Sequence, residues 1–185
     1  MINQTLSEAE KKMDKAVDVT REDFAAIRTG RAHPSMFHKI NADYYGSPTP
    51  LQQLASFTVP EARVIIISPY DHGAMGAIER AIRDSDLGVN PTDDGKTIRV
   101  VLPELTEDRR KDYIKLARHK AEEGRVSVRN IRRHAKQSLD KLEKDGEVGK
   151  DDVTGAEKRL DGMTKKHTDE IDEMLKVKEA ELLEV

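Results

Sequence analysis

Basic side chains recur along one face of a helix predicted over residues 106–145. A helix turns by about 100° per residue, which places four of them within about 40° of each other. The four are Arg118, Arg125, Arg129 and Lys136, and Arg132 and Arg133 flank them; we call these six residues the basic face. Guanidinium groups suit bidentate contact with phosphate oxygens. The basic face therefore predicts binding of a polyanion, with nucleic acid as the first candidate.

A run of charge on a long helix is often only a solvated surface, and that interpretation stays open. Against it, seven Arg or Lys residues lie from Arg118 to Lys136, and only Glu122 and Glu123 oppose them. The whole chain has a formal net charge of −3, so the positive charge is local. No aromatic residue is interleaved here, which disfavours stacking on single-stranded bases. Backbone phosphates of structured RNA or of a duplex fit better.

No set of residues predicts catalysis or metal binding. The six histidines include no pair at the i, i+4 spacing of a zinc motif, and cysteine is absent. Neither a serine-centred elbow nor a Walker loop occurs. The carboxylates of Asp93 and Asp94 could suggest a metal ligand, but a turn before a strand explains them. We expect no enzyme activity, no cofactor and no metal.

Composition limits the fold and the compartment. Charged and hydrophobic residues each make up 36% of the 185 residues, against about 25% and 45–50% in typical domains. Such a chain suits amphipathic helices, which need only one apolar stripe. The sequence has no membrane-length apolar run and no signal peptide pattern, and the absence of cysteine fits a reducing compartment. We expect a cytoplasmic protein with no membrane partner.

All seven prolines lie between Pro34 and Pro103, and this marks a change of architecture. Outside that window three helices are predicted, over residues 5–28, 106–145 and from about 151 to the C-terminus. Their apolar seams recur every three or four residues, as in coiled coils. The expected fold is α+β: an elongated antiparallel three-helix bundle (residues 1–29 and 106–185) with a small, β-rich α/β domain (31–104) inserted.

The seams define the expected core of the bundle. The seam of the first helix consists of Leu6, Ala9, Met13, Val17, Thr20, Phe24 and Ile27. The seam of the second consists of Ile114, Ala117, Ala121, Gly124, Val128, Ile131, Ala135, Ser138 and Leu142, whose small residues imply close approach of a neighbouring helix. The third seam includes His167, which we expect to be a tolerated boundary residue. Thr5 with Glu8, or Ser7 with Glu10, offers a capping box for the first helix, and Thr106 can cap the second.

In the insert, β-branched runs bounded by turn residues predict strands at 56–59, 63–68 and 97–102, with a weaker strand over 36–45. Asp71 is placed to cap a short helix that continues to about Asp84. Two short connections join the domains, near residues 29–33 and 103–106. Their residues Thr29, Gly30, Arg31, Pro103, Glu104, Leu105 and Thr106 suit a hinge, although a rigid corner explains them equally well.

Several motifs, in order along the chain, resemble those of one bacterial family. They lie at residues 12–15, 27–32, 44–51, 53–55, 102–111 and 128–133. Together they run nearly end to end, and they are similar to the bacterial ribosome recycling factor family. The resemblance implies an L-shaped pair of domains, in which the α/β domain is hinged on the bundle.

The same resemblance implies a function. Members bind the post-termination ribosome and, with elongation factor G and GTP, promote its dissociation into subunits and release from mRNA. The implied partners of this chain are large-subunit ribosomal RNA and elongation factor G, and we expect a monomer. Arg129, Arg132 and Arg133 would contact the RNA, with Arg125, Lys136 and Arg118 on the same face. Arg110, Arg28 and Arg31 lie beside the hinge and could serve either RNA or the hinge.

A different class of function remains as an alternative. The helices could form a coiled-coil interaction module, such as a chaperone-like adaptor, whose binding to a protein client would survive loss of the arginines. A hydrolase would need clustered polar groups around the insert, and the sequence offers none.

Overall fold

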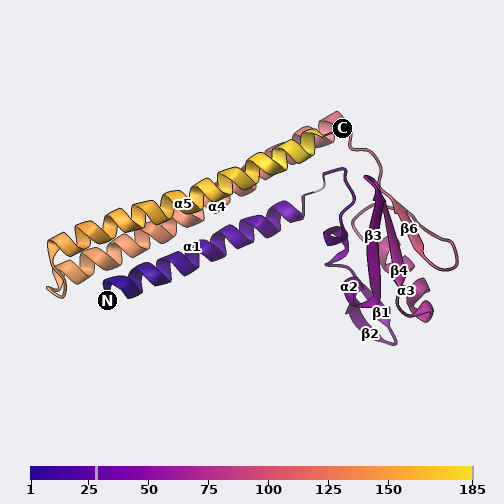
Figure 1. The fold of residues 1–185 in the computed structure, drawn as a ribbon, viewed down its shortest axis with the longest axis horizontal. Coiled ribbons are helices and arrows are strands. Elements are labelled where there is room, and N and C mark those ends of the chain that lie inside the picture. The colour runs from indigo at the N-terminus through magenta and orange to yellow at the C-terminus, as the bar shows by residue number, and fades with distance from the viewer. Residues whose placement is uncertain (28, 185) are drawn as a thin grey trace. The chain divides into compact units, whose positions relative to one another are not determined.

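The computed structural model describes residues 1–27 and 29–184. The chain divides into two compact units, Met1–Ile27 with Lys111–Val185, and Arg28–Arg110, which we describe separately. The first unit is helical, and the second combines strands with short helices (Figure 1). The predicted α+β class with two architectures in one chain is confirmed.

Three long helices form the first unit: α1 (Ile2–Ala25), α4 (Glu107–Lys144) and α5 (Lys150–Leu183) (Figure 1). Contacts between α4 and α5 run in opposite directions along the two helices, from Arg118 with Glu179 to Arg132 with Asp161. Contacts between α1 and α5 run in the same direction along both helices, from Asn3 with Arg159 to Arg21 with Glu170. Helix α4 is therefore antiparallel to α5, whereas α1 is parallel to α5.

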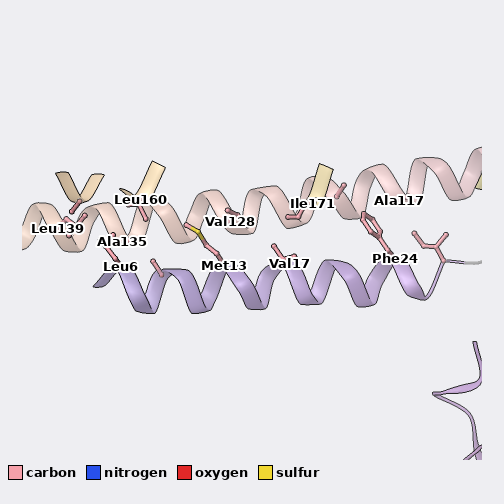
Figure 2. Packing of buried hydrophobic residues seen from close by; sticks show 14 of the residues in the cluster. Leu6, Met13, Val17, Phe24, Ala117, Val128, Ala135, Leu139, Leu160 and Ile171 are labelled. Carbon is pink, nitrogen blue, oxygen red and sulfur yellow. The ribbon is translucent and has the colours of Figure 1, made fainter. Parts of the chain in front are cut away.

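The core of the bundle follows the predicted seams closely (Figure 2). All seven seam residues predicted for the first helix are buried, although α1 ends at Ala25 and the last of them, Ile27, lies just beyond it. In α4 the prediction is wrong at one position, because Ser138 is exposed and Leu139 is fully buried instead. A strict 3.5-residue repeat drifts by about 20° per heptad against a straight helix, so near the end of a long helix the buried stripe moves to the next residue.

Gly124 marks the closest approach of the helices. An added Cβ here would overlap the Thr20 hydroxyl of α1 and would lie 3.1 Å from Cδ1 of Ile171 in α5. The Thr20 hydroxyl donates a hydrogen bond to the Ala16 carbonyl (3.0 Å), which satisfies this buried polar group. The small seam residues of α4 thus let all three helices meet, as predicted.

His167 is not a boundary residue, and the prediction for it is wrong. Its side chain is 0% exposed. Nδ1 lies 2.7 Å from the Met163 carbonyl oxygen, and Nε2 lies 2.6 Å from Oδ1 of Asp14 in α1. Each ring nitrogen thus has an oxygen partner within hydrogen-bond distance. A satisfied polar pair across α1 and α5 explains how a histidine occupies the seam.

The helix ends show which predicted caps form. Helix α1 begins at Ile2, so Thr5 and Ser7 lie inside its first turns and the predicted capping boxes are wrong; the Thr5 hydroxyl bonds the Met1 carbonyl instead. The Thr106 cap is confirmed, because its Oγ1 accepts from the Arg109 N–H (3.2 Å). At the other end of α4, Gly146 has φ +69° and its N–H bonds the Glu143 carbonyl, which closes the helix.

The second unit contains a four-stranded antiparallel sheet in the order β3-β4-β6-β5. Its strands are β3 (Ala55–Glu61), β4 (Val64–Pro69), β5 (Pro91–Asp93) and β6 (Ile98–Val101). A separate hairpin pairs β1 (Asn41–Tyr44) with β2 (Ser47–Pro50). The remaining elements are η1 (Pro34–Phe37), α2 (Leu51–Leu54), η2 (His72–Ala74) and α3 (Met75–Arg83). Ile78 and Ile82 of α3 join the buried residues of β4 and β6 in one core.

Prolines explain where the strand predictions fail. The strand expected over 36–45 begins only at Asn41, because Pro34 opens a helical turn and the His33 side chain accepts from the Ser35 N–H. Strands β2 and β5 contain Pro48, Pro50 and Pro91 and were not predicted. Each pairs on one side only, β2 with β1 and β5 with β6, where a missing N–H is tolerated.

Candidate nucleic-acid interface

Helix α4 carries the basic face on a firm support. The helix is 38 residues long, and its buried stripe includes Ala117, Ala121, Val128 and Leu139. These residues fix the rotation of α4 against α1 and α5. The side chains of the basic face are therefore held on the outside of the bundle.

One edge of the basic face is neutralised by α5. Arg118 bonds Glu179 (2.6 Å), Arg125 bonds Asp172 (2.7 Å) and Arg132 bonds Asp161 (2.6 Å). We call these three arginines the paired edge. Their positive charges are already balanced by carboxylates of the neighbouring helix.

Arg125 is the most enclosed member of the paired edge, with a side chain only 19% exposed. It also donates to Glu122 on its own helix (2.9 Å), so two carboxylates hold it. The hydrogen bond from Arg125 is the main cause that lowers the pKa of the Glu122 carboxyl, and Arg129 adds to it. The residue at the centre of the sequence pattern is thus the least accessible to a ligand.

The other edge is open to solvent. Arg133 and Lys136 are exposed, and neither makes a hydrogen bond or ion pair within residues 1–27 and 29–184. Arg129 is 56% exposed, and among the described residues it pairs only with Glu122, at 3.2 Å. We call Arg129, Arg133 and Lys136 the open edge. Consecutive residues point about 100° apart, so Arg132 and Arg133 cannot both face α5.

Lys115 belongs to the same surface and was missed by the sequence prediction. It lies 18 residues before Arg133, which is about five full helical turns, so the two side chains share one line along α4. Lys115 is exposed and makes no ion pair in the described part of the chain. The 18-residue spacing was the signal that could have identified it.

The remaining candidates lie elsewhere. Arg110 is half-buried in the first turn of α4 and points about 140° away from Arg133 around the helix. Arg31 is exposed in the other unit. Arg28 lies outside the described residues. The structure therefore does not place Arg110 or Arg31 on the basic face.

The two connecting segments lie side by side where they join the sheet. The Ala32 N–H bonds the Ala62 carbonyl and the Leu102 N–H bonds the Arg63 carbonyl, both at 2.7 Å, so both segments are held by the turn between β3 and β4. Gly30 has φ +78°, and an added Cβ would lie 3.5 Å from Cδ1 of Leu105. Both segments of the predicted hinge therefore leave this unit at the same place.

The described residues offer no metal site. They contain no group of three or more His, Asp or Glu that could hold a metal ion. The Asp94 carboxylate accepts hydrogen bonds from the N–H groups of Lys96 and Thr97, as expected for a turn. No described helix is long and apolar enough to cross a membrane.

Comparison with known proteins identifies the family. The family model described as ribosome recycling factor matches residues 20–183. The chain belongs to the ribosome recycling factor family. A ribosome-recycling factor from Nocardioides sp. (strain ATCC BAA-499 / JS614) is 77% identical over 185 residues, which is 100% of both chains.

Solved structures of the ribosome recycling factor family share this fold. A solution structure of the ribosome recycling factor is 41% identical, has a TM-score of 0.83, and the match covers 100% of this chain and 98% of that one. A second match is a model of the T. thermophilus ribosome recycling factor and the E. coli elongation factor G bound to the E. coli post-termination complex. Its TM-score is 0.71 at 38% identity, with 100% of both chains covered.

Proposed function

We propose that this chain recycles ribosomes: it binds the post-termination ribosome and, with elongation factor G and GTP, promotes dissociation into subunits and release from mRNA. Family membership and the likeness to a family member bound to that complex support the proposal. The observation that carries the binding step is the open edge, where Arg129, Arg133 and Lys136 present positive charge on a firm helix.

The open edge would bind phosphates of large-subunit ribosomal RNA. Within the described residues, Arg133 and Lys136 pair with no carboxylate, so a phosphate does not have to displace an existing ion pair. Each phosphate neutralised releases counterions, which makes binding weaken as salt rises. The paired edge would have a different task, because Arg118, Arg125 and Arg132 hold α5 against α4.

The rest of the proposal concerns how binding leads to dissociation. The paired connecting segments, with Gly30 beside Leu105, would form a hinge that lets the inserted unit reorient as a rigid body. The chain itself would not be an enzyme, since GTP hydrolysis would be the task of elongation factor G. It would act in the cytoplasm, as a monomer and without a cofactor.

A subunit-splitting assay tests the function. Purified post-termination ribosomes are mixed with the chain, with and without elongation factor G and GTP, and dissociation is followed by light scattering. We expect dissociation only with the complete mixture. Arg133→Ala should slow it at limiting concentrations of the chain, whereas Arg80→Ala should not, because Arg80 is an exposed arginine of α3 in the other unit. No dissociation by the complete mixture would overturn the proposal.

A further inference from the structure

Tyr45, at the tip of the β1–β2 hairpin, presents its ring to solvent. Its φ is +50°, and it is the one non-glycine residue with positive φ among those described. Gly46 follows with φ +83°, so the two residues form the two-residue loop of the hairpin, whose central residues both take positive φ. Asn, Asp and Gly are the usual residues in such a loop, whereas Tyr45 places an aromatic ring there that is 82% exposed.

Asp71 fixes where the Tyr45 ring lies. Its Oδ2 accepts hydrogen bonds from the hydroxyls of Tyr44 (2.8 Å) and Tyr45 (3.3 Å), and its Oδ1 accepts from the Gly73 N–H (2.9 Å). The two tyrosine rings pack edge to face with centroids 4.6 Å apart. An exposed ring and a carboxylate are thus held together by three elements: the β1–β2 hairpin, the loop after β4 and the start of η2.

The carboxylate is charged under physiological conditions. The hydrogen bond from the Tyr44 hydroxyl is the main cause that lowers the pKa of Asp71, and the bond from the Gly73 N–H adds to it. The same bond raises the pKa of the Tyr44 hydroxyl. The exposed Tyr45 ring therefore lies beside a negative charge.

We propose that Tyr45 and Asp71 form a docking site for an arginine side chain of a basic protein partner. A guanidinium group can stack on an aromatic ring and pair with a carboxylate, whereas an ammonium group offers no planar surface. Asp71 would repel the phosphates of RNA. Residues 31–104 carry seven Lys or Arg against nine Asp or Glu, so this segment has no excess of positive charge that would favour RNA. The site goes beyond the proposed function, which assigns RNA contacts to α4.

Tyrosine-selective NMR provides the test, because the full chain contains only four tyrosines. The ring-¹³C-labelled chain is titrated with a blocked Gly-Arg-Gly-Arg-Gly peptide, with the same peptide carrying lysine, and with a ten-residue oligouridine. We expect the arginine peptide to move the signals of Tyr44 and Tyr45 most strongly. Tyr113, half-buried in the bundle, serves as the internal reference.

Three variants separate the ring from the charge. Tyr45→Leu removes the ring, Asp71→Asn removes the charge, and Tyr45→Phe keeps the ring without its hydroxyl. An exposed cation–π contact is worth about 0.5–1 kcal/mol, so Tyr45→Leu should weaken arginine-peptide binding about two- to fivefold. We expect a similar loss for Asp71→Asn and a smaller one for Tyr45→Phe. Unchanged methyl signals of Ile78 and Ile82, which are buried in the same unit as Tyr45 and Asp71, show that each variant is folded.

Three results would overturn the docking site: Tyr45 signals that do not respond to the arginine peptide, an equal response to oligouridine, or unchanged affinity in Asp71→Asn. The titration contains no ribosomes. Its failure would therefore leave the subunit-splitting result standing, and a failed splitting assay would leave this site standing.

Discussion

The two edges of the basic face carry similar side chains in different surroundings. On the paired edge, Arg125 lies between Glu122 and Asp172 and is only 19% exposed. On the open edge, Arg133 and Lys136 are exposed and make no ion pair with the described residues. The difference shows that arginines on one face of a helix do not all present their charge to a ligand. The neighbouring helix α5 decides which charges hold the bundle together and which remain for a ligand.

Charge reversal on the open edge should produce the largest effect. In Arg133→Glu with Lys136→Glu, two cations that would attract phosphate are replaced by two carboxylates that repel it. We expect ribosome binding to weaken about tenfold to a hundredfold, or one to two steps of about 1.4 kcal/mol. Filter binding to purified ribosomes measures this. Reversal of two lysines away from the face, Lys11→Glu with Lys158→Glu, is the control. Equally weakened binding in both double variants would show that only net charge matters.

Removal of an arginine from the paired edge should affect stability instead. Arg125→Ala leaves Asp172 without its arginine partner and Glu122 with Arg129 alone, and we expect the free energy of unfolding to fall by about 1 kcal/mol, because Asp172 is solvated. Urea unfolding followed by circular dichroism measures this. Arg133→Ala should leave the midpoint unchanged. A destabilised Arg133→Ala together with an unaffected Arg125→Ala would invert the assignment of the two edges.

Removal of its carboxylate partner should make an arginine of the paired edge available to phosphate, like the residues of the open edge. Asp161→Ala removes the carboxylate that holds Arg132 at 2.6 Å. We expect the loss of an exposed pair to cost at most about 1 kcal/mol of stability, while the slope of log affinity against log salt steepens by about one. Glu10→Ala, on an exposed part of α1, makes the same change in net charge. If both variants steepen the slope equally, the release of Arg132 is not the cause.

The smallest effect concerns acid pH and Glu122, the carboxylate shared by Arg125 and Arg129. Its pKa is lowered in the folded chain, chiefly by the hydrogen bond from Arg125. Its contribution to stability is therefore present above the unfolded pKa, about 4.3, and is lost as the pH falls through the folded value. In Glu122→Gln the decline in stability below about pH 5 should be shallower. Parallel declines in both proteins would rule out this contribution.

The sequence predicted the elements of this fold better than the environment of single residues. Apolar periodicity located all three long helices, and the distribution of prolines located the insert. The buried histidine could not be predicted, because its partner Asp14 lies 153 residues away in the sequence. Strands β2 and β5 were missed since proline lowers strand propensity everywhere except at sheet edges, and edges are known only once the sheet is assembled.

The candidate site shows the same limit. Helical geometry placed six basic residues on one face, and that prediction required only α4. The division into two edges depends on the rotation of α5, which brings Asp161, Asp172 and Glu179 against alternate turns of α4. Sequence spacing gives no information on that rotation. It therefore ranked Arg125 with Arg133, although only one of them is exposed.

The salt dependence of ribosome binding tests the central claim most directly. The slope of log affinity against log salt is measured for the unmodified chain, for Arg133→Ala with Lys136→Ala, and for Arg125→Ala. We predict that the double variant lowers the magnitude of the slope by about two, one for each phosphate that is no longer neutralised, while Arg125→Ala leaves it unchanged. An unchanged slope in the double variant, or an equal reduction per residue in Arg125→Ala, would contradict the division into an open and a paired edge.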